Sequence, residues 1–242
     1  MSYVKHQPCP KCGSRDNLAV YADHEYCFGC GYVNFYAYHP RRILDTKETT
    51  RKIVSLPEDI APYIPAVADN WIKKYDLTQR ELNDNRVVWS EQRSLLVFPY
   101  FDEKMFLFGW QGRYFGSDPK HPKWTGSGNF KDMVRVYHPN PLTSSKDTSI
   151  IIIEDIISTI KLSRQYNSSC LFGSTVNFNH YITIFNKYKP KEFIIWLDKD
   201  KMKESYKYSY SFNKIGIACR VISTDLDPKL YSNDEIRRII ES

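Results

Sequence analysis

The sequence lacks a long uninterrupted hydrophobic segment. Its longest apolar run, SIIIIEDII beginning at Ser149, meets two acids after five residues, whereas a helix that spans a membrane needs about 20 apolar residues. The first residues, MSYVKHQPCPKCGS, lack the apolar stretch of a secretory signal. These absences predict a protein with no membrane segment that works in the reducing cytoplasm.

Dense basic tracts are also missing, although 34 Lys and Arg against 28 Asp and Glu give a net charge of +6. This mild basicity permits nucleic acid as a partner without requiring it. With 242 residues, of which 42% are hydrophobic and 15% aromatic, the chain can bury at least one real core. Disorder is therefore excluded as its overall state.

Three zones of different composition follow one another along the chain. Residues 1–38 contain short strand-like pieces separated by Gly, Asn and Asp, and residues 39–55 are polar and typical of a flexible linker. Residues 56–146 contain a helical stretch over 68–84 and then strands, which predicts an α+β subdomain. Residues 147–242 alternate apolar strands with helices, the pattern of a parallel sheet covered on both faces. The predicted fold class is α/β (α+β) with a small N-terminal module.

The expected elements can be given as ranges. In the middle zone the strands are expected at 87–90, 94–101 and 105–115. In the last zone strands are expected at 149–154, 168–173, 192–198 and 218–223, and helices at 156–167, 179–188 and 202–216.

Four of the six cysteines form two close pairs, CPKC and CFGC, with fourteen residues between the pairs. Four thiolates on two such turns can close a tetrahedron around zinc, and a Gly follows each pair where the backbone must turn. The alternatives are two disulfides, which a reducing setting disfavours, and a redox-active pair, which would need a surrounding βαβ unit. The predicted zinc ligands are Cys9, Cys12, Cys27 and Cys30.

A zinc module of this size presents a surface rather than a catalytic cavity, so binding is its expected role. The residues suited to contact a template combine positive charge with stacking and hydrogen-bonding groups. They are Arg15, His24, Tyr26 and Phe28. The alternative is that these are ordinary surface residues of a small hairpin.

Acidic residues follow the predicted strands of the last zone where these strands end. Glu154 comes directly after four isoleucines, Asp198 and Asp200 come after FIIWL, and Asp227 follows ACRVIS after a short loop. The carboxyl ends of parallel strands share one edge of a sheet, so these carboxylates are expected to gather there. Gathered carboxylates repel one another unless a cation neutralises them, and oxygen ligands favour Mg2+ or Mn2+. The alternative is that each acid only caps the helix that follows it.

The order of these features resembles the primase half of phage primase-helicase proteins, in which a zinc ribbon and a linker precede a polymerase core with an acidic TOPRIM part. The segment NLAVYADHEYCFGCGYVN is similar to that family's zinc-module hairpin, and FPYFDEKMFLFGWQGRYF is similar to its polymerase-core strands. The resemblance covers nearly the whole chain. It implies a zinc-ribbon template-binding module at 1–38, a polymerase core from 56 and a TOPRIM subdomain with a C-terminal helix at 147–242.

Two positions depart from the family pattern. Asp155 stands where the family usually has Gly after the Glu, and Ser158 stands where a second acid is often found. The first change costs backbone freedom at the turn unless Asp155 itself caps the following helix. The second removes one possible metal ligand, so activity is expected to be weaker or more metal-dependent than in the family.

The resemblance implies a DNA primase, which makes short primers from nucleoside triphosphates on a single-stranded DNA template by metal-dependent nucleotidyl transfer. One structural Zn2+ would be held by the four cysteines. Catalysis and the binding of Mg2+ or Mn2+ fall to Glu154, Asp198, Asp200 and Asp227. Contacts to nucleotide or template are expected from Arg113, Lys123, Lys131, His24 and Arg15.

The sequence contains no Gly-x4-Gly-Lys-[Ser/Thr] phosphate loop, so the helicase half of the family is absent from it. A replicative helicase is then an expected partner, either as a separate protein or as the rest of a longer chain. The protein is expected to be a monomer when isolated and, if phage-encoded, to act in the host cytoplasm. Two other functions stay open: a TOPRIM nuclease, and a catalytically silent adaptor that binds single-stranded DNA and positions a helicase.

Overall fold

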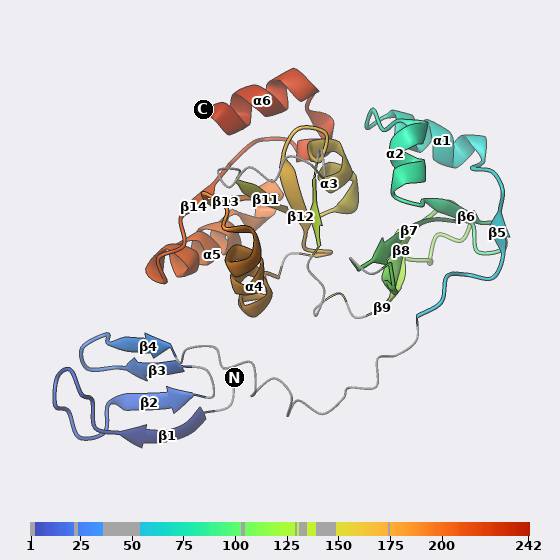
Figure 1. Ribbon diagram of the computed structural model, residues 1–242. Coiled ribbons are helices and arrows are strands. Elements are labelled where there is room, and N and C mark those ends of the chain that lie inside the picture. The colour runs from blue at the N-terminus through green and yellow to red at the C-terminus, as the bar shows by residue number, and fades with distance from the viewer. Residues whose placement is uncertain are drawn as a thin grey trace. The chain divides into compact units, whose positions relative to one another are not determined.

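In the computed structural model, the described residues are 3–21, 24–35, 54–102, 105–128, 130, 135–138, 149–173 and 175–242. Contacts within the chain divide it into two units, Met1–Lys52 and Ile53–Ser242 (Figure 1). The linker predicted at 39–55 lies outside the described residues except for its last two positions. No described helix is long and apolar enough to cross a membrane.

The first unit is an antiparallel sheet of four short strands, hydrogen-bonded in chain order. The strands are β1 (Tyr3–Gln7), β2 (Leu18–Tyr21), β3 (His24–Cys27) and β4 (Val33–Phe35). Its described core cluster consists of Cys9, Leu18 and Cys27, with Tyr32 packed against it. So few buried groups do not stabilise a fold of this size by themselves. The unit therefore needs a further source of stability, such as a bound metal ion.

The second unit begins with a five-stranded antiparallel sheet in the order β5-β6-β7-β8-β9. Its strands are β5 (Ile60–Ala61), β6 (Val88–Ser90), β7 (Leu95–Phe101), β8 (Leu107–Tyr114) and β9 (Trp124–Gly128). Side chains of β7 alternate between two cores, because Leu96 and Phe98 join one cluster while Leu95 and Val97 join another. The three strands predicted for this zone correspond to β6, β7 and β8.

Two short helices pack on this sheet, α1 (Ala66–Lys73) and α2 (Gln79–Asp84). The single helical stretch predicted over 68–84 is wrong in this respect, because the chain breaks at Asp76, whose φ of 59° is left-handed. Thr78 then begins α2 as its N-cap, in a reciprocal capping box with Glu81. Polar groups of the backbone and side chains, rather than the apolar spacing, decide where these helices end.

The second sheet of this unit has the order β10-β12-β11-β13-β14. Its strands are β10 (Val136–Tyr137), β11 (Ile150–Ile153), β12 (Asn167–Cys170), β13 (Phe193–Trp196) and β14 (Cys219–Val221). Neighbouring strands are parallel except β10, which pairs antiparallel with β12. The predicted α/β fold class is confirmed, and β10 joins this sheet from before the boundary predicted at 146/147.

Helices cover both faces of the parallel sheet (Figure 1). They are α3 (Ile156–Leu162), α4 (Phe178–Tyr188), α5 (Met202–Lys214) and α6 (Asn233–Glu241), with short 3-10 turns η3 (Lys199–Lys201) and η4 (Pro228–Leu230). α4 and α5 pack on the face that carries Ile150 and Ile152, and α3 and α6 pack on the face that carries Ile151 and Ile153. Burial on both faces explains why β11 is a continuous apolar run.

Helix α3 packs against both sheets of the second unit. Its Leu162 lies in the core under the parallel sheet, while Ile156, Ile157 and Ile160 join the core of the antiparallel sheet. A second connection lies at the end of β12, where the Phe172 ring is 4.1 Å from the ring of Tyr100 on β7. The carboxyl ends of β11 and β12 therefore lie beside the antiparallel sheet.

Arg164, in the turn after α3, ties this helix to α2. Its Nε lies 2.5 Å from Glu81 Oε1, and its Nη1 lies 2.9 Å from Asp76 Oδ2. The guanidinium also donates a hydrogen bond to Asn233 Oδ1 at the start of α6. The side chains of Arg164 and Glu81 are each 18% exposed, so water screens this ion pair only partly.

We expect Arg164→Ala to lower the free energy of unfolding by about 3 kcal/mol, because the change leaves the Glu81 carboxylate largely buried without its partner. Urea unfolding of the full chain measures the loss. Arg80→Ala is the matched control, since Arg80 pairs with Asp84 at 3.6 Å on the exposed side of α2 and should cost under about 0.5 kcal/mol. Equal losses in the two variants would contradict a structural role for Arg164.

Candidate functional site

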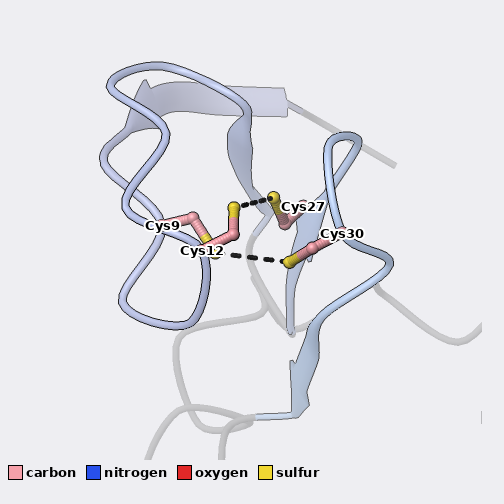
Figure 2. Close-up of side chains that lie close together, drawn as sticks. All are labelled: Cys9, Cys12, Cys27 and Cys30. Carbon is pink, nitrogen blue, oxygen red and sulfur yellow. Dashed lines mark hydrogen bonds between the residues drawn. The ribbon is translucent and has the colours of Figure 1, made fainter.

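The four predicted zinc ligands converge in the first unit (Figure 2). The sulfur of Cys9 lies 3.8 Å from that of Cys30, and the sulfur of Cys12 lies 3.7 Å from that of Cys27. All four sulfurs lie within 4.8 Å of one another, and no disulfide joins them. A tetrahedron with metal–sulfur bonds of about 2.3 Å has sulfur–sulfur edges of about 3.8 Å. The cluster therefore fits a zinc ion.

Each pair of cysteines sits on a turn that a glycine completes. Gly13 and Gly31 have φ values of 69° and 70°, in the left-handed region that favours glycine. Their backbone N–H groups donate to the carbonyls of Cys9 and Cys27 at 2.9 Å. These bonds fold each Cys-x-x-Cys loop back on itself, so both of its thiols face the same point.

The residues predicted to contact a template are only partly described. Arg15 is exposed, and the exposed ring of Phe28 lies edge-on to Tyr26 at 5.0 Å beside the cysteine cluster. His24 begins β3, but its side chain lies outside what is described, and Lys131 lies outside the described residues altogether. The first unit thus presents exposed cations, among them Arg15 and the Lys11 of the first cysteine turn, and an exposed aromatic ring near its four cysteines.

The predicted acidic residues lie at the carboxyl ends of neighbouring strands. β11 pairs with β13 so that Ile153 is opposite Trp196, and Glu154 directly follows the first strand while Asp198 follows the second. Asp200 lies in η3, and Asp227 immediately precedes η4 after β14. The sheet therefore brings these acids to one edge, called here the acidic edge.

Burial and neighbouring negative charges raise the pKa values of two carboxyl groups at the acidic edge. Burial, followed by the neighbouring charges of Asp198 and Asp200, raises the pKa of Glu154 to about 7. Burial and Asp227 likewise raise the pKa of Asp198 to about 6. Glu154 Oε2 is buried and has no hydrogen-bond partner among the described residues. A cation that these oxygens could share would remove the cost of ionising both groups.

Lys229 is a member of the acidic edge that the sequence analysis missed. Its Nζ lies 2.6 Å from Asp227 Oδ2 and 3.3 Å from Asp155 Oδ2, and its side chain is largely buried. Burial lowers the pKa of Lys229, but the charges of Asp155 and Asp227 outweigh this effect and hold the pKa above its ordinary value. The signal in the sequence was the position of Lys229 two residues after Asp227.

The cysteine sulfurs already lie close enough together to bind a metal ion, whereas two of the acids are paired with lysines. Among the described residues, the four cysteines are the one group of His, Cys, Asp or Glu side chains whose ligand atoms are close enough together to hold a metal ion. At the acidic edge, Lys201 pairs with Asp200 at 2.9 Å and Lys229 pairs with Asp227. Carboxylates of this edge would have to turn away from these lysines to share a divalent cation.

Asp155 and Ser158, the two positions that depart from the pattern described above, are hydrogen-bonded to each other in the structure. Asp155 is the N-cap of α3, with an extended backbone, and its Oδ1 accepts hydrogen bonds from the N–H groups of Ile157 and Ser158. Ser158 is buried and donates its hydroxyl to Asp155 Oδ2 at 2.6 Å. Asp155 therefore needs no left-handed backbone, and Ser158 serves the cap rather than the acidic edge.

In the second unit, the two basic candidates that the structure describes are Arg113 on β8 and Lys123 directly before β9. Arg113 lies opposite Trp124, and its guanidinium is 5.5 Å from the ring centre of Trp71 and 5.9 Å from that of Trp124. Lys123 is exposed, and its carbonyl accepts a hydrogen bond from Tyr114. Successive strand residues face opposite sides of a sheet, so Lys123 is aligned with the side opposite to Arg113. Arg113 contacts two tryptophan rings, whereas Lys123 is exposed to solvent.

The raised pKa of Glu154 predicts a pH dependence of stability. Because the folded state holds this proton more tightly than the unfolded state, whose value is about 4.5, this contribution to stability is present at pH 4.5 and lost as the pH rises through about 7. Glu154→Gln should therefore be more stable than the natural chain at pH 8, and this advantage should be much smaller at pH 5. The expected gain is about 1 kcal/mol, since the carboxylate is half-buried and solvent screens it.

Urea unfolding of the zinc-loaded protein without Mg2+ or Mn2+, at pH 5 and pH 8, measures this difference. Glu58→Gln at an exposed site is the control and should shift neither value. A natural chain that gains stability relative to Glu154→Gln between pH 5 and pH 8 would refute the prediction.

No protein-family model and no curated protein matches the sequence. Solved structures do match. A DNA primase domain from Pseudomonas aeruginosa is 17% identical with a TM-score of 0.61, covering 74% of this chain and 73% of that one. The zinc-binding and RNA polymerase domains of the Aquifex aeolicus primase are 15% identical with a TM-score of 0.58, covering 100% of this chain and 80% of that one.

A third similar structure is a DnaG primase catalytic domain bound to ssDNA, 12% identical with a TM-score of 0.58, and the match covers 73% of each chain. At these identities the likeness shows the fold. The chain therefore has the fold of DNA primase catalytic cores, preceded by a four-cysteine cluster that fits zinc.

Proposed function

We propose that this protein is a DNA primase that makes short primers from nucleoside triphosphates on single-stranded DNA. The observation that carries the proposal is the acidic edge, where Glu154 and Asp198 end neighbouring parallel strands in a fold shared with primase catalytic cores. A zinc-binding module ahead of that fold adds support, because the Aquifex aeolicus primase structure combines the same two parts. The TOPRIM identity of the parallel sheet and a kinship with phage primase-helicase proteins belong to this proposal.

The residues of the acidic edge fit a divalent cation of the Mg2+ or Mn2+ type. All candidate ligand atoms are carboxylate oxygens, and Glu154 offers a buried oxygen without a hydrogen-bond partner among the described residues. The proposed ligands are Glu154, Asp198, Asp200 and Asp227. When bound, such an ion stabilises negative charge on a transferring phosphoryl group and on the pyrophosphate that leaves.

The protein's own side chains have separate proposed tasks. Glu154, whose pKa burial and neighbouring acids raise to about 7, would either hold the cation or accept the proton of the attacking 3′ hydroxyl. Asp198 and Asp200, with Asp227 in support, would hold the cation that binds the incoming triphosphate. Arg113, Lys123 and Lys131 are proposed to contact triphosphate or template backbone, and Arg15 and His24 to contact template at the zinc module.

Of the proposed partners, the template has support from the comparison with solved structures. One similar primase domain is described as bound to ssDNA, which supports single-stranded DNA as the template here. We also propose a replicative helicase as partner, a monomeric state for the isolated chain, and action in the cytoplasm, of the host cell if the protein is phage-encoded. The four cysteines would keep one structural zinc.

The test is to incubate the full chain with single-stranded DNA of mixed sequence, labelled ribonucleotides and deoxynucleotides, and Mg2+ or Mn2+, without an added primer. New short oligonucleotides would support the primase and reveal its sugar preference. Shortened template would instead indicate a nuclease. Intact template with bound protein and no product would indicate a silent adaptor for single-stranded DNA.

A further inference from the structure

Helix α5 carries an exposed face on which lysines alternate with tyrosines. The opposite face is buried against the parallel sheet through Ser205, Ser209 and Phe212. The exposed residues of the helix are Lys203, Tyr206, Lys207, Tyr210, Asn213 and Lys214. At 3.6 residues per turn, the three lysines and two tyrosines fall within an arc of about 100°. They form one stripe, called here the α5 stripe.

The two tyrosines of this stripe are unusually open to solvent for aromatic residues. Tyr206 is 60% exposed and Tyr210 is 68% exposed. Their spacing of four residues makes them neighbours on the helix surface, about 6 Å apart along its axis. Two adjacent exposed rings can each stack on an unpaired base, whichever base it is.

The charge of the α5 stripe is complementary to a phosphate backbone. Lys203 and Lys207 flank Tyr206, and Lys214 lies one turn beyond Tyr210. None of the exposed residues of α5 is acidic, since its Glu204 is half-buried at the margin of the stripe. Lysines interleaved with exposed aromatic rings are the combination by which proteins hold single strands.

The α5 stripe begins close in sequence to the acidic edge. α5 begins directly after η3, which contains Asp200 of the acidic edge, so Lys203 is close in sequence to that carboxylate. From Lys203 to Lys214 the helix is about 17 Å long. The stripe therefore leads away from the acidic edge over the length of a few nucleotides.

We propose that the α5 stripe binds a single-stranded nucleic acid, with its lysines on phosphates and Tyr206 and Tyr210 stacked on bases. Whether that strand is the template or the new primer rests on the proposed function, but the binding itself does not. The stripe lies on the parallel-sheet half of the second unit, and so it would be a nucleic-acid contact additional to the basic candidates of the antiparallel sheet.

The experiment uses the full zinc-loaded chain and fluorescein-labelled oligothymidylate and oligouridylate, with binding followed by anisotropy at several salt concentrations. Tyr206→Ala with Tyr210→Ala should weaken binding at least about tenfold and leave the salt dependence unchanged. Lys203→Gln with Lys207→Gln should reduce the slope of log affinity against log salt by about 1.4, because each contact to a single strand contributes about 0.7.

The matched control is Arg237→Gln with Arg238→Gln, which removes the same charge from exposed positions of α6 and should change neither quantity by as much. Thermal melts verify that each variant is folded. Affinities of both α5 variants equal to that of the control would overturn the proposal, as would a natural chain that binds neither oligonucleotide. A preference for oligouridylate that Tyr206→Ala with Tyr210→Ala abolishes would assign the stripe to an RNA primer, and a preference for oligothymidylate lost in the same way would assign it to the template.

Primer synthesis is measured on the same samples, so that the two proposals fail separately. Loss of binding in the tyrosine variant together with no primers from the natural chain would support the stripe and refute the primase. Primers from the natural chain, together with unchanged binding by both α5 variants, would support the primase and refute the α5 stripe as a binding site.

Discussion

Asp198→Asn is expected to reduce unprimed synthesis by the full chain at least about 1000-fold. Asp198 follows β13 beside Glu154, and burial together with Asp227 raises its pKa to about 6. An amide lacks the charge that holds a divalent cation, and such a cation supplies several kcal/mol of stabilisation to a phosphoryl transfer. Each 1.36 kcal/mol corresponds to tenfold in rate, so the loss of about 4 kcal/mol gives this factor.

The matched control for this result is Asp225→Asn. Asp225 lies in the loop after β14, is 86% exposed, and pairs with the exposed Lys199 at 2.6 Å. An exposed pair of this kind contributes little, so synthesis should stay within about twofold of the natural rate. Asp198→Asn should also keep its affinity for single-stranded DNA, which shows that the protein is folded. Retention of more than a tenth of the activity by Asp198→Asn would exclude the proposed role of the acidic edge.

Cys27→Ser is expected to unfold the first unit while the second unit stays folded. Cys27 is both a member of the metal-binding cluster and part of the small core formed with Cys9 and Leu18. Metal binding in modules of this kind contributes about 10–16 kcal/mol near neutral pH, more than so small a core supplies without it. Zinc content should fall from one ion per chain to none. The amide resonances of residues 3–35 should move to the chemical shifts of an unfolded chain.

Cys219→Ser provides the control for loss of a thiol. Cys219 is buried at the start of β14 in the second unit, so this change should leave zinc content and the resonances of residues 3–35 as they are. A Cys27→Ser chain that keeps one zinc and a folded first unit would mean that three ligands suffice. Chelation of the natural protein should reproduce the Cys27→Ser result without any substitution.

Much of this architecture could be predicted because its signals are local. The apolar runs of β11 and β13 lie between helical segments, which is sufficient to predict a parallel sheet covered on both faces. The paired cysteines define a tetrahedral site by spacing alone. That Glu154 and Asp198 share an edge followed from the general geometry of parallel strands rather than from any particular contact.

The contacts that could not be predicted join residues far apart in the sequence. Arg164 pairs with Glu81 and Asp76, which lie far from it in the sequence, and no pattern near Arg164 predicts these partners. Lys229 similarly pairs with Asp155 as well as with its near neighbour Asp227. Sequence reasoning could predict which charges are present, but only the packing of α3 and η4 determines which of them are neutralised.

The position of α3 between the two sheets limits which parts of the chain can be exchanged by recombination. Because Leu162 serves one core while Ile156, Ile157 and Ile160 serve the other, neither half of the second unit keeps a complete core without this helix. Recombination near residue 146 would give the helix to one half and leave the other with an exposed apolar face. The parallel sheet and the antiparallel sheet are therefore expected to be exchanged between related genes together, whereas the unit with the four cysteines, which shares no core cluster with them, can be gained or lost separately.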